Sequence, residues 1–146
     1  MAYLVDSNVF VRLLHRTDPH HELMRTAVRT LWGQGETLYF TSQNLGEFWS
    51  VCTRPATLRG GYGLPVAEVN RRARCIERCY SLLPDTVGVH AEWRRLLVTH
   101  AVQGVSVHDA RLVAAMKVHD ITHILTLDDK DFARYTEIAA VHPQNV

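Results

Sequence analysis

Short apolar segments with strand-like composition alternate with longer segments of helical periodicity along the whole chain. This alternation restricts the possible folds more than any other property, because strands separated by helices pair in parallel and the helices cover both faces of the sheet. Runs of apolar, β-branched or aromatic residues predict strands at 2–5, 37–41, 82–84, 123–127 and 138–141. The sequence therefore predicts an α/β fold, a three-layer α/β/α sandwich with a central parallel sheet.

The intervening segments predict helices at 7–14, 20–32, 42–52, 65–81, 91–100 and 108–119. Ser7 and Ser42 each follow a predicted strand and are expected to cap the next helix. Pro65 suits a first helical turn, because it lacks an N–H that would otherwise go unpaired. The short polar segment after Pro143 is expected to fray.

Length and composition indicate one globular domain over residues 1–146. The chain is 47% hydrophobic with a formal net charge of +1, so a nucleic-acid surface must come from local charge. No apolar run is long enough to span a bilayer and no secretory leader precedes residue 3, so a cytoplasmic protein is expected. The three cysteines form no C-x-x-C pair and are interpreted as buried thiols in a reducing compartment.

Acidic residues occupy the places where predicted strands end and helices begin. They are Asp6, Glu47, Asp109, Asp128, Asp129 and Asp131. Each alone has an ordinary explanation as a helix cap, a first-turn acid, a solvated helix residue or a turn residue. In parallel α/β folds, however, the carboxyl ends of the strands gather functional groups at one edge of the sheet. Together the acids therefore indicate a shared site.

Carboxylate oxygens are the ligands that Mg²⁺ and Mn²⁺ prefer. Four clustered acids suit one or two such ions, and a bound metal that activates water supports phosphodiester hydrolysis. Like charges at such a site repel, so the acids are expected to have raised pKa values without metal.

Four stretches resemble the PIN-domain nucleases and, within them, the VapC-type toxins. They are LVDSNV at 4–9, SQNLGEF at 42–48, VHDARLVAAM at 107–116 and ILTLDDKDF at 124–132. They follow the order of the family blocks and span nearly the whole chain. The resemblance implies that Asp6, Glu47 and Asp109 are catalytic metal-binding acids.

For the fourth acid the resemblance leaves two candidates, Asp128 first and Asp131 second, and both can serve. It also implies polar support within the pocket from Asn8 and Thr126, whereas Asp129 is expected to face solvent. The activity implied is that of an Mg²⁺- or Mn²⁺-dependent endoribonuclease, the toxin of a VapBC-type toxin–antitoxin pair. The implied partners are an RNA substrate, a VapB-type antitoxin and a second copy in a homodimer.

Two groups of arginines are candidates for RNA contacts. Arg54 and Arg59 flank the glycine-rich loop after the Glu47 helix and are the preferred pair. Arg71, Arg74 and Arg78 share a helical face, which is either a phosphate-binding surface or a solvated face balanced by nearby glutamates. The nine histidines show no zinc-binding spacing.

Other functions fit the sequence less well. A non-catalytic PIN-like module that binds RNA or protein would not need the full set of acids. A DNA-directed nuclease would use the same metal chemistry, but the short chain has little room for a helical clamp. A receiver-like phosphoacceptor domain would have paired acids after its first strand, whereas Asp6 stands alone there.

Overall fold

Five parallel strands form the centre of the molecule, in the order β3-β2-β1-β4-β5. The computed structural model describes residues 1–146. The strands are β1 (Ala2–Val5), β2 (Thr37–Thr41), β3 (Ser81–Leu83), β4 (His123–Leu125) and β5 (Ala139–Val141). The helices are α1 (Ser7–Leu13), α2 (His21–Gly33), α3 (Ser42–Thr53), α4 (Val66–Cys79), α5 (Val87–Thr99) and α6 (Ser106–Val118), with 3₁₀ turns η1 (Asp129–Phe132) and η2 (Pro143–Asn145).

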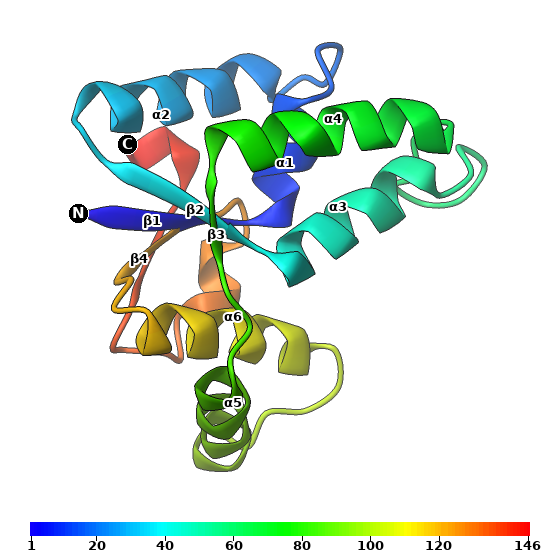
Figure 1. Cartoon of the computed structure of the whole chain (residues 1–146). Helices are drawn as coiled ribbons and strands as arrows, with labels where there is room; N and C mark the ends of the chain where they lie inside the picture. Colours follow the sequence, from blue (N-terminus) through cyan, green and yellow to red (C-terminus); the bar gives the residue numbers. More distant parts are fainter.

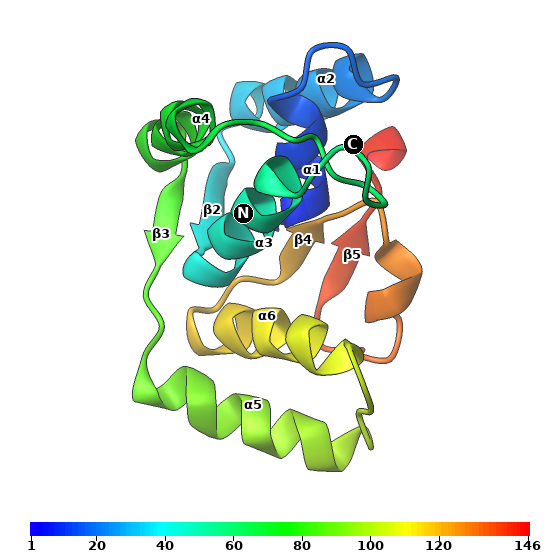
Figure 2. The ribbon, with the colours of Figure 1, turned by 90° about the vertical axis from the view of Figure 1, so that its right-hand side faces the viewer.

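Helices cover both faces of the sheet, which confirms the predicted three-layer α/β/α fold (Figure 1). Alternation along β1 separates the two cores, because successive side chains of a strand point to opposite faces. Tyr3 and Val5 pack with α1, α2, α3 and α4, whereas Leu4 packs with α5 and α6. Figure 2 shows α5 and α6 together on one side of the sheet. No helix combines the length and the apolar character needed to cross a membrane.

The chain moves outward from β1 through β2 to β3, then returns to β4 on the other side of β1. The direction of the chain thus reverses between β1 and β4, and ligands of open parallel sheets bind at the carboxyl ends of strands at such a reversal. Leu4 pairs with Tyr39 of β2 and with Ile124 of β4, so the residues that follow these three strands meet at one edge.

Several predicted boundaries were wrong for identifiable reasons. Asp6, not Ser7, caps α1, and the Thr41 hydroxyl, not Ser42, caps α3. Helix α5 begins at Val87, four residues earlier than predicted, because Thr86 caps a first turn that has no apolar pattern. Strand β4 ends at Leu125, because the backbone then turns to form the polar network described below.

Two expectations about exposure were also wrong. The segment after Pro143 is ordered as η2, where Pro143 is buried and the turn packs against α2. Of the three cysteines only Cys52 is buried, whereas Cys75 is half-buried and Cys79 is exposed.

Candidate functional site

Asp6 lies at the centre of the polar groups at this edge of the sheet. It directly follows β1 and is only 6% exposed. Its Oδ1 accepts a hydrogen bond from the Ser7 backbone N–H (2.7 Å), and its Oδ2 accepts one from the Thr126 hydroxyl (2.8 Å). Burial raises the pKa of Asp6 to about 6, repulsion from Glu47 and Asp109 adds to this, and the two hydrogen bonds oppose it.

Glu47 faces Asp6 from the second turn of α3. The Ser7 hydroxyl joins the two acids, since it donates to Glu47 Oε2 at 2.7 Å and lies 3.3 Å from Asp6 Oδ1. On the other side, the Gln43 amide donates to Glu47 Oε1 (2.9 Å) and to the His108 carbonyl of α6 (2.8 Å). Gln43 therefore ties the acidic turn of α3 to the helix that carries Asp109.

Asn8 joins Asp6 to Asp128. Its amide nitrogen lies 3.4 Å from Asp6 Oδ2, 3.2 Å from Thr126 Oγ1 and 3.0 Å from Asp128 Oδ2. Its amide oxygen accepts from the Leu127 N–H, and the Asp128 N–H donates to Thr126 Oγ1. Asn8 and Thr126, which were expected to give polar support, thus lie between Asp6 and Asp128. These two acids are 122 positions apart in the sequence.

Asp109 approaches from the first turn of α6. Burial raises its pKa to about 6, and repulsion from Asp131, then Glu47, then Asp128 raises it further, while Arg134 lowers it. The two candidates for the fourth acid thus occupy different positions. Asp128 is linked to Asp6 through Asn8, whereas Asp131 on η1 raises the pKa of Asp109 more than any other charged group does. Asp129, expected to face solvent, is half-buried.

The composition of this cluster fits a hard divalent cation. Its acids are Asp6, Glu47, Asp109, Asp128 and Asp131. All offer carboxylate oxygens, and repulsion among them adds to the effect of burial in raising the pKa values of Asp6 and Asp109, an effect that a bound cation would offset. No group of three or more Asp, Glu, His or Cys side chains already has a metal-binding arrangement. Neutral donors hold Asp6 and Glu47 instead, so cation binding requires their side chains to move.

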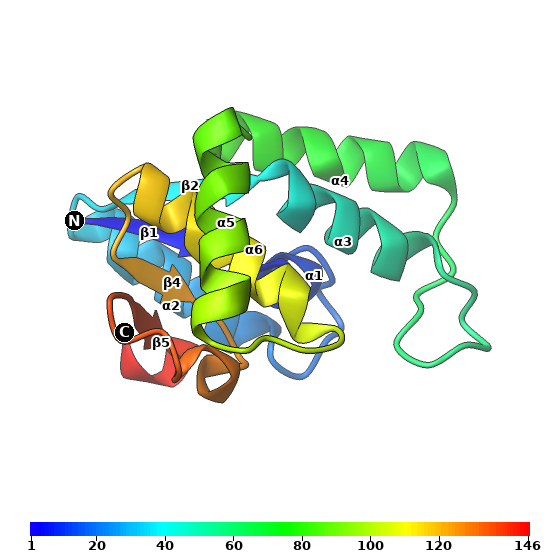
Figure 3. The same cartoon turned by 90° about the horizontal axis from the view of Figure 1, so that it is seen from below.

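The preferred RNA-binding arginines lie away from this cluster. Arg54 follows α3, and its guanidinium donates to the Arg59 carbonyl (3.0 Å), so it braces its own loop. Figure 3 shows that this loop projects beyond the carboxyl end of α3, away from the sheet. An RNA-binding role for Arg54 and Arg59 stays a prediction.

Sequence reasoning missed three residues that contact or influence the acids. Ser7 was treated as a helix cap, although it is adjacent to Asp6. Gln43 precedes Glu47 by four residues, a spacing that puts both on one helical face and was available as a signal. Arg134 had no local signal, because its proximity to Asp109 depends on how η1 packs near α6.

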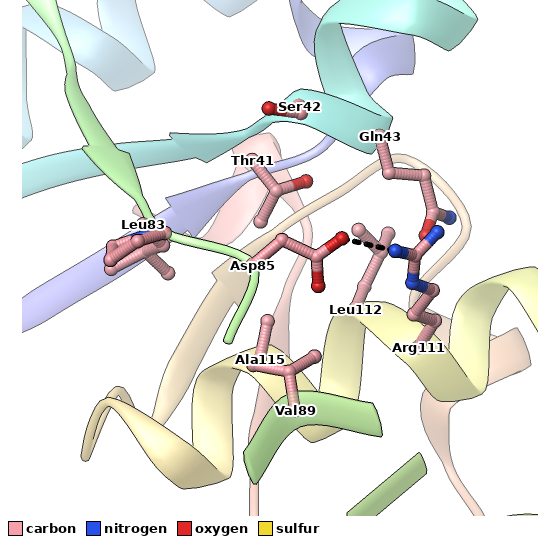
Figure 4. A pocket seen from close by; sticks show the side chains of 10 residues that line it. Thr41, Ser42, Gln43, Leu83, Asp85, Val89, Arg111, Leu112 and Ala115 are labelled. Carbon is pink, nitrogen blue, oxygen red and sulfur yellow. Dashed lines mark hydrogen bonds and ion pairs between the residues drawn. The ribbon is translucent and has the colours of Figure 1, made fainter. Parts of the chain in front are cut away.

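A small pocket lies beside Gln43 between β3, α3, α5 and α6 (Figure 4). An ion pair between Asp85 and Arg111 lies in its lining, together with the Thr41 and Ser42 side chains. Its volume of about 20 Å³ admits little more than one water molecule. The pocket is therefore too small to bind a nucleotide.

Solved structures of similar fold include VapBC and VapC proteins of bacteria. VapBC2 from Rickettsia felis bound to a promoter DNA fragment has a TM-score of 0.69 at 12% identity, covering 97% of this chain and 98% of that one. VapC20 from Mycobacterium tuberculosis, a sarcin–ricin loop cleaving toxin, has a TM-score of 0.66 at 20% identity, covering 92% and 95%. VapBC-1 from nontypeable Haemophilus influenzae has a TM-score of 0.67 at 13% identity, covering 99% of each chain. TM-scores of 0.66 to 0.69 at identities of 12% to 20% establish a shared fold alone.

Curated proteins give no sequence match. The family model of the PIN domain does match, over residues 3–138. That span contains all five clustered acids and strands β1 to β4 except for Ala2, whereas β5 lies beyond its end. The chain therefore belongs to the PIN domain family.

Proposed function

We propose that the protein is an Mg²⁺- or Mn²⁺-dependent endoribonuclease and the toxin of a VapBC-type toxin–antitoxin pair. The observation that carries the proposal is the meeting of five carboxylates from four distant segments at one sheet edge, where two of them have raised pKa values. Membership of the PIN domain family supports a nuclease. The similar fold of an RNA-cleaving toxin, VapC20, supports RNA as the substrate.

In this proposal Asp6, Glu47 and Asp109 hold the cation with Asp128, and Asp131 contributes from the Asp109 side. When bound, the cation supplies the positive charge that activates water and stabilises charge on the phosphate. Ser7 and Gln43 orient the Glu47 carboxylate, and Asn8 and Thr126 orient Asp6 and Asp128. Such outer contacts keep ligand oxygens in place during the reaction.

The proposal of an antitoxin partner follows from the family resemblance and from solved complexes of similar fold. Several structures of similar fold are toxin–antitoxin complexes, which supports a VapB-type antitoxin as the inhibitor of this chain. An arginine of such an antitoxin would pair with the acids and offset the repulsion among them. A homodimer and a cytoplasmic location complete the proposal.

The test is cleavage of RNA and of single-stranded DNA by the purified protein with Mg²⁺, Mn²⁺ or EDTA. We expect metal-dependent cleavage of RNA alone, and its loss in Asp109→Asn. Asp120→Asn is a matched control, because Asp120 lies outside the cluster with a φ of 57°, a conformation that asparagine tolerates. Calorimetric titration with Mn²⁺ should show binding to the wild type that Asp109→Asn weakens.

Full RNA cleavage by Asp109→Asn would contradict the proposed role of this acid. RNA binding with Mn²⁺ present but no cleavage would indicate a non-catalytic module. Cleavage of DNA in preference to RNA would indicate a DNA-directed nuclease.

A further inference from the structure

An open groove with a volume of about 1080 Å³ runs between α2 and α4, over the segment that follows α1. Five arginines line it: Arg16, Arg25, Arg29, Arg71 and Arg72. They come from the α1–α2 connection, α2 and α4, which lie around the end of α1 in Figures 1 and 2. The groove is distinct from the acidic edge of the sheet and has the opposite charge.

The positive charge of the groove is only partly neutralised. Arg71 and Arg72 share Glu68, and Arg25 pairs with Glu22 at 3.4 Å. Arg16 and Arg29 form no ion pair with any carboxylate. The five arginines therefore exceed the two glutamates by three charges in a chain whose formal net charge is +1. Such a local surplus attracts a polyanion.

The walls of the groove are held in place by the fold. The Arg72 guanidinium donates to the Leu14 carbonyl at 2.5 Å, which ties α4 to the end of α1. Leu13 and Leu14 line the groove but pack partly into the core. Only three of the twelve lining residues are hydrophobic, and none is a phenylalanine, tyrosine or tryptophan, whereas protein partners are usually anchored by apolar or aromatic side chains in well-packed pockets. These features favour a nucleic-acid backbone over an acidic peptide.

The groove also lies close to the acids along one helix. Asp6 caps the amino end of α1, and the groove begins at Leu13 at its carboxyl end. Seven helical residues span about 10 Å, a distance that a few nucleotides of single-stranded RNA cover. The end of the groove at Leu13 and the acid at Asp6 are therefore separated along α1 by a length that a short single strand can span.

We infer that the arginine groove binds the phosphate backbone of the RNA substrate outside the acidic cluster. The inference rests on the proposed ribonuclease function and adds where the substrate lies. Guanidinium groups pair with phosphate oxygens through two parallel hydrogen bonds, and they do so without reading sequence. The groove therefore contributes affinity, whereas cleavage depends on the acids.

The test is the affinity of the full chain for fluorescein-labelled oligouridylate in EDTA, measured by anisotropy at several salt concentrations. The variant Arg16→Ala/Arg29→Ala removes the two unpaired groove arginines. We expect weaker binding and a slope of log K against log salt that falls by about 0.7 for each lost contact. The matched control is Arg94→Ala/Arg95→Ala, which removes the same charge from exposed positions of α5 outside the groove.

Equal affinities and equal salt slopes for the groove variant and the control would overturn the inference. Stronger binding of a polyglutamate peptide than of oligouridylate, lost in the groove variant, would also overturn it and indicate an acidic protein partner. Binding in EDTA separates this inference from the proposed function. RNA binding that depends on the groove, without metal-dependent cleavage, would contradict only the nuclease proposal. Metal-dependent cleavage together with unchanged RNA binding by the groove variant would contradict only the inference about the groove.

Discussion

Replacement of Asp6 by asparagine should stabilise the metal-free protein at neutral pH. The folded protein raises the pKa of Asp6 from 3.8 to about 6, mainly through burial. Each pKa unit corresponds to about 1.4 kcal/mol, so the ionised carboxylate destabilises the fold by about 3 kcal/mol above pH 6. Asparagine removes this charge and still caps α1, but it loses the acceptor of the Thr126 hydroxyl, at about 1 kcal/mol.

The expected net gain is about 2 kcal/mol, which raises Tm by roughly 4–8 °C in a chain of this size. The sign depends on pH. Between pH 6 and pH 4 the folded protein binds a proton at Asp6 while the unfolded chain stays ionised, so the wild type gains stability as pH falls through this window. The advantage of Asp6→Asn should therefore be present at pH 7.5 and disappear near pH 4.

Thermal unfolding in EDTA at pH 7.5 and pH 4.5, followed by circular dichroism, measures both effects. Asp120→Asn is the control, because it changes the same functional group outside the cluster. A lower Tm for Asp6→Asn at pH 7.5, or a gain that does not change with pH, would refute the reasoning. Added Mn²⁺ should reverse the order, because the wild type gains ligand-binding energy that the variant lacks.

Gln43→Ala should lower RNA cleavage by about 10- to 100-fold with little change in Tm, because the Glu47 carboxylate keeps only the Ser7 hydroxyl as a donor. A wild-type kcat in steady-state kinetics would refute this. Phe132→Ala should lower the free energy of unfolding, measured by chemical denaturation, by about 3–5 kcal/mol, since this fully buried ring packs η1 against the core. A loss below about 1 kcal/mol would contradict that packing. Iodoacetamide at pH 8 should alkylate exposed Cys79 in the folded protein but not Cys52, whose thiol has a pKa raised to about 11 by burial; peptide mass spectrometry decides between them.

Local patterns predicted the sheet better than they predicted the ends of the helices. The strands at 2–5 and 37–41 have the expected bounds, because buried apolar runs followed by polar residues are visible in the sequence. The start of α5 was not predicted, since Val87 and Gly88 are exposed and form no apolar stripe. The 3₁₀ turn η2 was not predicted either, because its order depends on packing against α2.

Sequence position predicted that acids gather at one edge of the sheet, because residues that follow adjacent parallel strands meet there, and their metal-binding role stays a prediction. It did not separate the roles of Asp128 and Asp131. Their separation depends on Asn8, which orients Asp128 toward Asp6, and on η1, which brings Asp131 near Asp109.

The order of strand-like and helix-like segments encodes the layered architecture and the edge where the acids gather, since both follow from local periodicity and parallel pairing. The hydrogen bonds among the acids and the arginine groove depend on contacts between segments far apart in the chain. Ser7 meets Glu47 across 40 positions, and Arg72 meets Leu14 across 58. Such contacts are set by how helices pack on the sheet, and helix packing is a property of the whole core and not of any local stretch.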